Sequence, residues 1–486
     1  MALLLTLFLT ALIAFVGHYL WIWTYWMRKG VKGPRGWPFV GVLDQLLEHE
    51  TPGMLKLGEW TKKYGAVYGI TDGTQKTLVV ADPAMVHEIF VKQFDNFYGR
   101  KLNPIQGDPE KDARVHMLAA QGHRWKRLRT ISAPTFSHGS LRKLKPTVED
   151  CALELLRHIE KRTAGGEQID MLRFYQEYTM DVIGRVAMGQ HDSQIFRNPI
   201  VDVVRDHGSP AFKLYSIMEE VVRARVEQRE QDVARGSELG EPHDFIDLFL
   251  NAKSDVDFGH EANEAFTKRN MKVTKELSAE EVVGQCFLFL IAGFDTTALS
   301  LSYSTYLLAT NPKVMAKLQE EVDRECPDPE ITFDQLAKLK YMEMVLKEVL
   351  RMYPLASISN SRKCIRDTNV CGMEIEAGTH VQVDTWSIHY DPKIWGDDVA
   401  EFKPERWETT SDEHLEHKGS YIPFGLGPRQ CIGMRLALME QKVLLAHILK
   451  RYTLEPGTLT RIPLKLVGSA TTSPQDVYLH LRPRNV

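Results

Sequence analysis

The segment from Ser278 to Thr310 constrains the fold more than any other part of the chain. Ser278 and Glu281 have the spacing of a capping box, in which each side chain bonds the backbone N–H of the other residue. The Asn-Pro pair at 311–312 ends the helix, which therefore has ~32 residues and a length of ~48 Å. Residues 286–293, CFLFLIAG, are apolar on every face. A helix of this kind must run through the centre of the body.

Polar residues interrupt this apolar helix directly after Gly293. Asp295, Thr296 and Thr297 follow it, and a buried carboxylate needs a partner or solvent. Gly293 itself lowers helix stability by ~1 kcal/mol relative to alanine. Two interpretations stay open. Either the hydroxyls bond back to helix carbonyls and Asp295 pairs with a distant base, or these residues line a functional groove.

A lone cysteine, Cys431, lies in the glycine-rich sequence FGLGPRQCIG, just before an amphipathic run. We expect it to open a helix, where free N–H groups and the helix dipole lower the pKa of the thiol. The glycines of this loop leave room for a flat partner to approach the sulfur. A cysteine nucleophile would need a nearby base. The only basic residue in this local sequence is Arg429, and its guanidinium cannot accept a proton. We therefore interpret Cys431 as a ligand of an iron that a macrocycle already holds.

The six cysteines form no CxxC pair, which argues against a disulfide framework and a structural zinc site and indicates a reducing compartment. The net charge is -4, so the chain lacks the basic footprint of nucleic-acid binders, and no nucleic-acid partner is expected.

Helical periodicity dominates the rest of the chain. Two short regions predict hairpins, AVYGI with KTLVV across Asp72 and Gly73, and MEIEAGTHVQV around Gly378. The fold class is mainly α with small β-sheets. Besides the central helix, the clearest predicted helices are Val148–Lys161, Ser216–Arg235, Pro312–Cys326 and Asp334–Met352.

The N-terminus predicts a membrane anchor. No residue from Ala2 to Met27 is charged, and this length exceeds the roughly 20 residues that span a bilayer. Aromatic residues that resemble an interfacial belt close the segment, namely Trp21, Trp23, Tyr25 and Trp26. Basic residues follow at once, so the body should face the cytosol. We expect a transmembrane anchor at 1–28, a proline- and glycine-rich elbow at 29–45 and a catalytic domain at 46–486.

Several motifs together resemble the cytochrome P-450 superfamily. FGLGPRQCIG is similar to its haem-binding loop, with Phe424 seven residues before the cysteine and Gly433 two after it. AGFDTT (292–297) resembles the oxygen-activation stretch, EVLR the Glu-x-x-Arg pair, and FKPERW (402–407) and WKRLR (125–129) two further signatures. The resemblance covers nearly the whole chain and includes the anchor of microsomal members. It is strongest toward the animal subgroup of three-series drug-metabolising enzymes and thromboxane synthase.

The resemblance implies the family's fold, an α-rich triangular body around a haem b, and a role for each matching residue. Cys431 would be the axial ligand of the haem iron, and Thr296 with Asp295 would relay protons on the opposite face. The implied cofactor-binding residues are Trp125, Arg129, Arg362, Arg429, Phe424 and Gly433. The implied structural network is Glu348, Arg351 and Arg406, and the implied substrate pocket contains Phe289, Ala292 and Ala356.

The implied activity is insertion of one oxygen atom of dioxygen into a lipophilic substrate, such as a xenobiotic, a steroid or a fatty acid. Electrons would come from NADPH through a flavoprotein reductase, with cytochrome b5 as an optional second donor. The enzyme would lie in the endoplasmic reticulum membrane as a single-pass protein. Basic residues at 124–127 and 142–145 are either a landing surface for the reductase or solvated helix faces.

Residues 205–212, RDHGSPAF, are shorter than the lid of microsomal relatives, which weakens inference of the substrate. Two alternatives therefore stay open. The chain could be a haem-thiolate isomerase of lipid peroxides, or a catalytically impaired haem-binding variant.

Overall fold

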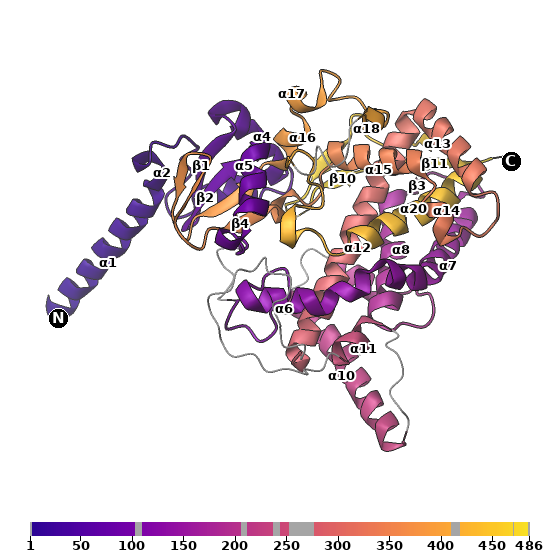
Figure 1. The fold of residues 1–486 in the computed structure, drawn as a ribbon, viewed down its shortest axis with the longest axis horizontal. Coiled ribbons are helices and arrows are strands. Elements are labelled where there is room, and N and C mark those ends of the chain that lie inside the picture. Colours follow the sequence, from indigo (N-terminus) through magenta and orange to yellow (C-terminus); the bar gives the residue numbers. More distant parts are fainter. Residues whose placement is uncertain are drawn as a thin grey trace.

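The computed structural model describes residues 2–102, 109–205, 211–236, 244–251, 277–409, 418–469 and 471–484. Figure 1 shows a helix-rich body with a small β-rich part beside the N-terminus. The predicted fold class, mainly α with small sheets, is confirmed. Of residues 205–212, which we expected to form a shortened lid, 206–210 lie outside the described residues.

Helix α12 (Ala279–Thr310) runs through the centre of the body, as its apolar sequence predicts. Ser278 and Glu281 form the expected capping box, with both reciprocal hydrogen bonds present. Nearly all its side chains from Glu281 to Leu290 and from Thr297 to Ala309 are buried. Among the helices that pack around it are α8 (Met171–Ala187), α10 (Ala211–Ala234), α15 (Lys340–Met352) and α20 (Met434–Arg451).

Most predicted helices are present with shifted ends. The helix expected at Asp334–Met352 is interrupted, because α14 (Phe333–Leu336) ends before α15 begins at Lys340. Helix α7 starts ten residues earlier than expected and carries Pro146 inside it. The other helices of more than four residues are α4 (Gly53–Tyr64), α5 (Pro83–His87), α6 (Gly122–Ser132), α7 (His138–Thr163), α9 (Pro199–Arg205), α11 (Phe245–Leu250), α13 (Pro312–Glu325) and α16 (Thr385–His389).

The main sheet contains the first predicted hairpin. Strands β1 (Val67–Asp72) and β2 (Gln75–Val80) pair antiparallel, and the sheet order is β1-β2-β7-β4. The second predicted hairpin is wrong, since β6 (Met373–Ile375) pairs with β5 (Thr368–Val370), whereas β7 (His380–Val383) lies parallel to β2. Alternation of polar and apolar residues marks a strand but does not identify its partner. The remaining strands are β3 (Ile169–Asp170), β4 (Ser361–Lys363), β8 (Tyr452–Pro456), β9 (Lys465–Val467), β10 (Ser473–Gln475) and β11 (Tyr478–Pro483).

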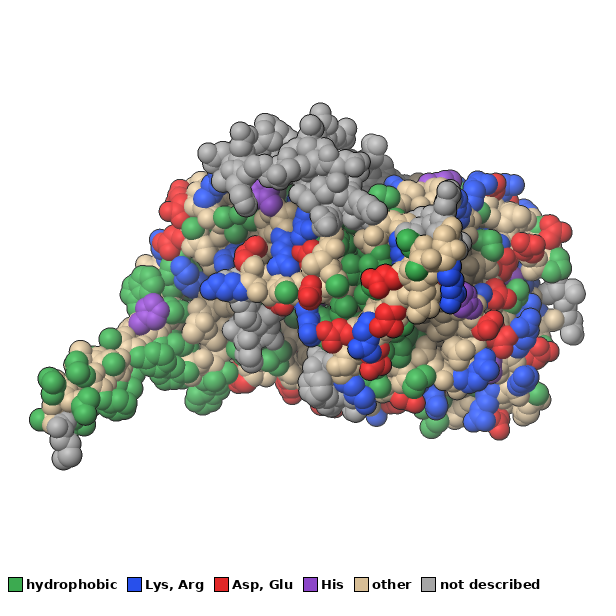
Figure 2. All heavy atoms as spheres, turned by 90° about the horizontal axis from the view of Figure 1, so that it is seen from below, with side chains coloured by type: hydrophobic (Ala, Val, Ile, Leu, Met, Phe, Trp, Pro, Cys, Tyr) green, Lys and Arg blue, Asp and Glu red, His purple; other side chains and the backbone are tan. Residues whose placement is uncertain are grey.

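The N-terminal helix α1 (Ala2–Trp23) projects away from the body, and Figure 2 shows its apolar side chains standing clear of the mixed surface. Its length and hydropathy of 2.1 suffice to cross a membrane. The expected aromatic belt is only partly correct. Tyr25 and Trp26 are buried against the main sheet, and Trp26 Nε1 donates a hydrogen bond to the carbonyl of Ile70 at 2.8 Å.

Candidate functional site

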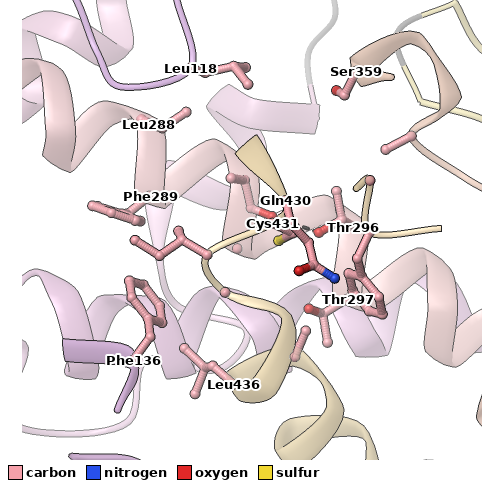
Figure 3. Close-up of a pocket in the computed structure, with 18 of the residues that line it drawn as sticks. Leu118, Phe136, Leu288, Phe289, Thr296, Thr297, Ser359, Gln430, Cys431 and Leu436 are labelled. Carbon is pink, nitrogen blue, oxygen red and sulfur yellow. Dashed lines mark hydrogen bonds between the residues drawn. The ribbon is translucent and has the colours of Figure 1, made fainter. Parts of the chain in front are cut away.

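A cavity lies between α12, α6 and the loop that precedes α20. Figure 3 shows Cys431 directed into this cavity from the loop and Thr296 directed into it from α12. Apolar side chains form much of the wall, among them Leu118, Phe136, Leu288, Phe289 and Leu436. The motifs that lie apart in the sequence therefore meet around one space.

The loop before α20 holds Cys431 in place through backbone geometry. Gly425 and Gly427 have φ angles of 78° and 72°, a backbone region that residues other than glycine rarely adopt. A Cβ atom on Gly427 would stand 2.1 Å from the carbonyl oxygen of Phe90. The backbone N–H of Cys431 donates to the carbonyl of Phe424 at 2.8 Å and closes the loop. The sulfur is thus fixed while its side chain stays accessible from the cavity.

The expected pKa of Cys431 needs correction. The helix begins at Met434, so the cysteine precedes it and does not open it. The sulfur faces the cavity but is surrounded by protein, and this burial raises the pKa of the Cys431 thiol above its usual value, although the N–H groups of Gly433 and Met434 and the nearby Arg129 act in the opposite direction. The helix end alone therefore does not produce a thiolate here. A metal ion bound to the sulfur would produce one, because a coordinating thiol is deprotonated.

Four arginines line the same cavity: Arg100, Arg129, Arg362 and Arg429. Arg362 bonds the carbonyls of Ser361 and Leu426 at 2.7 and 3.1 Å, and Arg429 bonds that of Ala120 at 2.7 Å. The Nε atoms of Arg100, Arg362 and Arg429 are buried without a hydrogen-bond partner among the described residues. Backbone carbonyls of the chain therefore accept only some of the hydrogen bonds that these guanidinium groups can donate.

The arginines also lack compensating charge within the described cavity wall. Glu440 is the one carboxyl group there, and burial raises its pKa to about 8, which favours the neutral form. Burial, followed by the charges of Arg100 and Arg129, lowers the pKa of Arg362 well below its usual range. A ligand with carboxylates would relieve this repulsion and fill the free donors. The two propionates of a haem, with the iron at Cys431, fit these residues.

Arg100 is a site residue that the sequence analysis missed. Its side chain is buried, burial lowers its pKa to about 10, and it bonds the carbonyl of Ser359. The residue stands alone in an irregular segment, so no spacing pattern marked it. Trp125 is a predicted member of the same wall, with the guanidinium of Arg429 4.4 Å from its ring centroid.

The two polar residues predicted for catalysis point in different directions. Thr296 lines the cavity, and its hydroxyl donates to the carbonyl of Ala292 at 2.7 Å. Asp295 is not part of the lining and accepts hydrogen bonds from Gln176 at 3.2 Å and Thr471 at 3.0 Å. Each residue of α12 is turned by about 100° from the one before it, and here this turn takes the Asp295 side chain out of the cavity wall, although Thr296 and Thr297 both line it. The expectation that the Asp295 carboxylate faces the haem beside Thr296 therefore needs correction.

The predicted ion network is present behind the cysteine loop. Arg351 binds both carboxylate oxygens of Glu348 at 2.8 Å, and the two side chains are fully buried. Arg406 contacts Glu348 at 3.3 Å, and Trp407 Nε1 donates to it at 3.1 Å. The remaining predicted pocket and loop residues, Phe289, Ala292, Ala356, Phe424 and Gly433, all line the cavity.

The basic residues that we considered as a reductase surface are largely engaged elsewhere. Arg124 and Arg127 bind Glu281, the capping residue of α12. Arg142 pairs with Asp334, and Lys145 is buried against Glu149. These contacts favour structural roles for most of the two clusters.

Comparison with known proteins decides the family. The family model described as Cytochrome P-450 matches residues 31–200 and 194–481. The chain belongs to the cytochrome P-450 family. It is 71% identical to cytochrome P-450 CYP13A2 of Caenorhabditis elegans over 96% of each chain. It is also 58% identical to CYP13A4 over 97% of each chain, and 57% identical to CYP13A5 over 97% of this chain and 98% of the relative, both from the same organism.

Membership establishes the general chemistry. The protein is a haem-thiolate monooxygenase of the oxidoreductase class, and such proteins use an electron-donating partner, an organic substrate and dioxygen. The two matches of the family model overlap at residues 194–200, next to the segment expected to be shortened.

Proposed function

We propose that this P-450 oxidises a membrane-partitioning, apolar substrate, with Cys431 as the iron ligand. The observation that carries the proposal is the cavity itself, where one accessible thiol faces a space whose wall also holds four arginines. Among the described residues, no other cysteine lines this cavity. Thiolate and carboxylate-binding groups in one pocket are what a haem requires.

Bound haem supplies the activation of dioxygen, and the chain's residues hold and orient it. We assign the propionates to Arg100, Arg129, Arg362 and Arg429, with Trp125 packed beside Arg429. We assign to Phe424 and Gly433 the shaping of the cysteine loop, and to Glu348, Arg351 and Arg406 its support from behind.

Proton handling at the cavity wall falls to Thr296. Its hydroxyl bonds only a carbonyl of its own helix, so it can exchange that bond for one to a bound water and hold a proton at Oγ1. Asp295 would act indirectly, because Gln176 and Thr471 hold its carboxylate outside the cavity lining. We therefore rank Thr296 as the direct group and Asp295 as its supporting neighbour.

The substrate class follows from the lining. Phe289 stands in a cluster of aromatic rings, 5.6 Å from Phe136 and 5.3 Å from Phe245 between centroids, and Ala292 and Ala356 leave space beside it. The apolar and aromatic side chains of this part of the wall favour a lipophilic molecule such as a xenobiotic, a steroid or a fatty acid.

We further propose that NADPH supplies electrons through a flavoprotein reductase at the endoplasmic reticulum membrane. Support comes from α1, whose exposed apolar surface suits lipid, and from the basic residues that follow it, which favour a cytosolic body. The division would be an anchor at 1–28, an elbow at 29–45 and a catalytic domain at 46–486.

The deciding experiment compares two supplies of oxidising equivalents. Purified protein in lipid vesicles is given a panel of apolar substrates with NADPH, reductase and dioxygen, or a lipid peroxide alone. We expect oxygenated substrate with NADPH, reductase and dioxygen, and none from Cys431→Ser. Rearrangement of the peroxide itself, with no oxygenated substrate under the first conditions, would contradict the proposal and favour an isomerase.

A further inference from the structure

His389, the last residue of α16, connects two parts of the molecule that the family motifs treat separately. Its imidazole is fully buried. Nδ1 lies 3.1 Å from the carbonyl oxygen of Arg351, and Nε2 lies 3.1 Å from the backbone nitrogen of Ile422. One ring thus bridges the helix that carries the Glu-x-x-Arg pair and the start of the cysteine loop.

The partners determine which nitrogen carries the proton. A carbonyl oxygen only accepts and a backbone N–H only donates, so Nδ1 holds the hydrogen and Nε2 is the acceptor. Burial and then the charge of Arg351 lower the pKa of His389 to about 3, although its backbone hydrogen bonds act in the opposite direction. The imidazole therefore stays neutral near pH 7 and keeps its acceptor.

The side facing Arg351 is rigid. Arg351 donates through Nη1 to the carbonyl of His389 at 2.9 Å, so the two residues exchange hydrogen bonds in both directions. The same guanidinium holds Glu348 through two bonds of 2.8 Å. The ring of His389 also stacks on Tyr421, with centroids 5.6 Å apart. This arrangement leaves the imidazole little freedom to move.

The side facing Ile422 leads to the sulfur in two steps. The carbonyl of Ile422 accepts from the N–H of Gly425 at 3.0 Å and from the Asn360 amide at 3.1 Å. Two residues after Ile422, the carbonyl of Phe424 accepts the N–H of Cys431 at 2.8 Å. The position of the Ile422 peptide therefore helps to fix the position of Cys431.

We propose that His389 is a positioning residue for the iron ligand: its neutral Nε2 holds the Ile422 peptide and transmits the rigidity of the Glu348–Arg351 pair to Cys431. This inference rests on the proposed function, because it takes Cys431 as the thiolate ligand. The motif comparison assigned no role to this histidine, and no sequence spacing pointed to it.

Two substitutions separate the two hydrogen bonds of the ring. His389→Gln places an amide oxygen near Nε2, where it can accept the N–H of Ile422, and gives up the bond to Arg351. His389→Asn places an amide N–H near Nδ1, where it can donate to Arg351, and leaves the N–H of Ile422 unpaired. The readouts are the thiolate band of the reduced carbon monoxide complex and the rate of haem loss from the purified holoprotein.

We expect His389→Gln to keep the thiolate band, with haem loss within about twofold of wild type. His389→Asn should lose haem at least about fivefold faster and show a reduced thiolate band, because an unpaired buried donor is costly. His447→Asn is the matched control. It removes a bond of 3.0 Å from Nε2 of another buried imidazole to Glu149, and it should lower the unfolding temperature without changing the band.

Equal behaviour of the two His389 variants, or the reverse order, would overturn the inference. If neither variant folds, amide hydrogen exchange in the wild-type holoprotein decides, since the N–H of Ile422 should be protected like that of Cys431. Exchange at Ile422 as fast as in an unfolded peptide would also overturn it. A wild-type protein without the thiolate band would instead contradict the proposed function, so the two failures are distinguishable.

Discussion

Two groups of buried arginines lie on either side of the cysteine loop, and they differ in how their charge is compensated. Behind the loop, Arg351 and Arg406 share the carboxylate of Glu348, Arg406 also pairs with Asp398, and backbone carbonyls accept from other donors of the two side chains. In the cavity, Arg362 and Arg429 keep unpaired Nε atoms and face no ionised carboxylate among the described residues. We call an arginine network complete when carboxylates of the chain compensate its charge, and such a network stabilises the fold. An incomplete network lacks these carboxylates and marks the place of a charged ligand.

The largest effect should come from breaking the complete network. Glu348→Gln leaves the buried Arg351 without its counter-charge, and we expect the free energy of unfolding to fall by about 3–5 kcal/mol. Chemical denaturation measures this. The control Glu59→Gln removes an exposed pair with Lys56 and should change stability by less than about 1 kcal/mol. Equal effects in the two variants would remove the distinction between complete and incomplete networks.

A second complete network, around Glu149, predicts that the stability of the protein depends on pH. Burial acts to raise the pKa of Glu149, but hydrogen bonds from His447, Lys145 and the N–H of Ile331 lower it to about 2, against an ordinary value of 4.5. A lowered carboxyl pKa adds stability that is present above pH 4.5 and lost as the pH falls toward 2, about 3 kcal/mol in all.

Denaturation of wild type and Glu149→Gln between about pH 6 and pH 3 checks this prediction, because the variant lacks the titrating group. The difference in the free energy of unfolding between wild type and Glu149→Gln should become smaller as the pH falls. A constant difference in stability would show that the pKa of Glu149 is the same in the folded and the unfolded chain.

Removing charge from the incomplete network should act on the cofactor and not on the fold. Arg362→Met deletes a cation that Arg100 and Arg129 repel, so the folded chain loses no counter-charge. We expect haem to bind about ten- to a hundredfold more weakly, while the stability of the haem-free protein stays within about 1 kcal/mol. Haem titration and denaturation give the two values. A stability loss as large as that of Glu348→Gln would show that Arg362 is structural.

The smallest change in stability is expected at Thr296. Its hydroxyl bonds the carbonyl of Ala292 in its own helix, so Thr296→Val should alter unfolding by less than about 1 kcal/mol. We expect the yield of product per NADPH consumed to fall instead. Thr305→Val is the control, because it removes a similar bond of 3.0 Å to the carbonyl of Leu301 away from the cavity. An unchanged yield in Thr296→Val would exclude the proton role.

Local spacing explains what the sequence predicted well. The capping box, the Glu348 and Arg351 pair and the cysteine loop are encoded within a few residues, so pattern alone located them. Arg100 and His389 act through partners far away in the chain, Ser359 and Ile422, and carry no local signal. The pairing of β7 with β2 is likewise non-local.

The sequence also did not predict which way neighbouring side chains of a helix point. Asp295 and Thr296 are neighbours in a motif, yet the Asp295 side chain is directed away from the cavity and bonds Gln176 and Thr471. The thiol pKa was mispredicted for a related reason. The sequence shows that a helix follows Cys431, but how deeply the sulfur is buried depends on distant elements.

The central claim is that Cys431 binds the iron of a haem as a thiolate. The most direct test is the carbon monoxide difference spectrum of the reduced, purified protein, recorded for wild type and Cys431→Ser. We predict the long-wavelength Soret band of a thiolate-bound haem in the wild type and its loss in the variant. A wild-type protein that carries no haem, or a band that survives the substitution, would contradict the account.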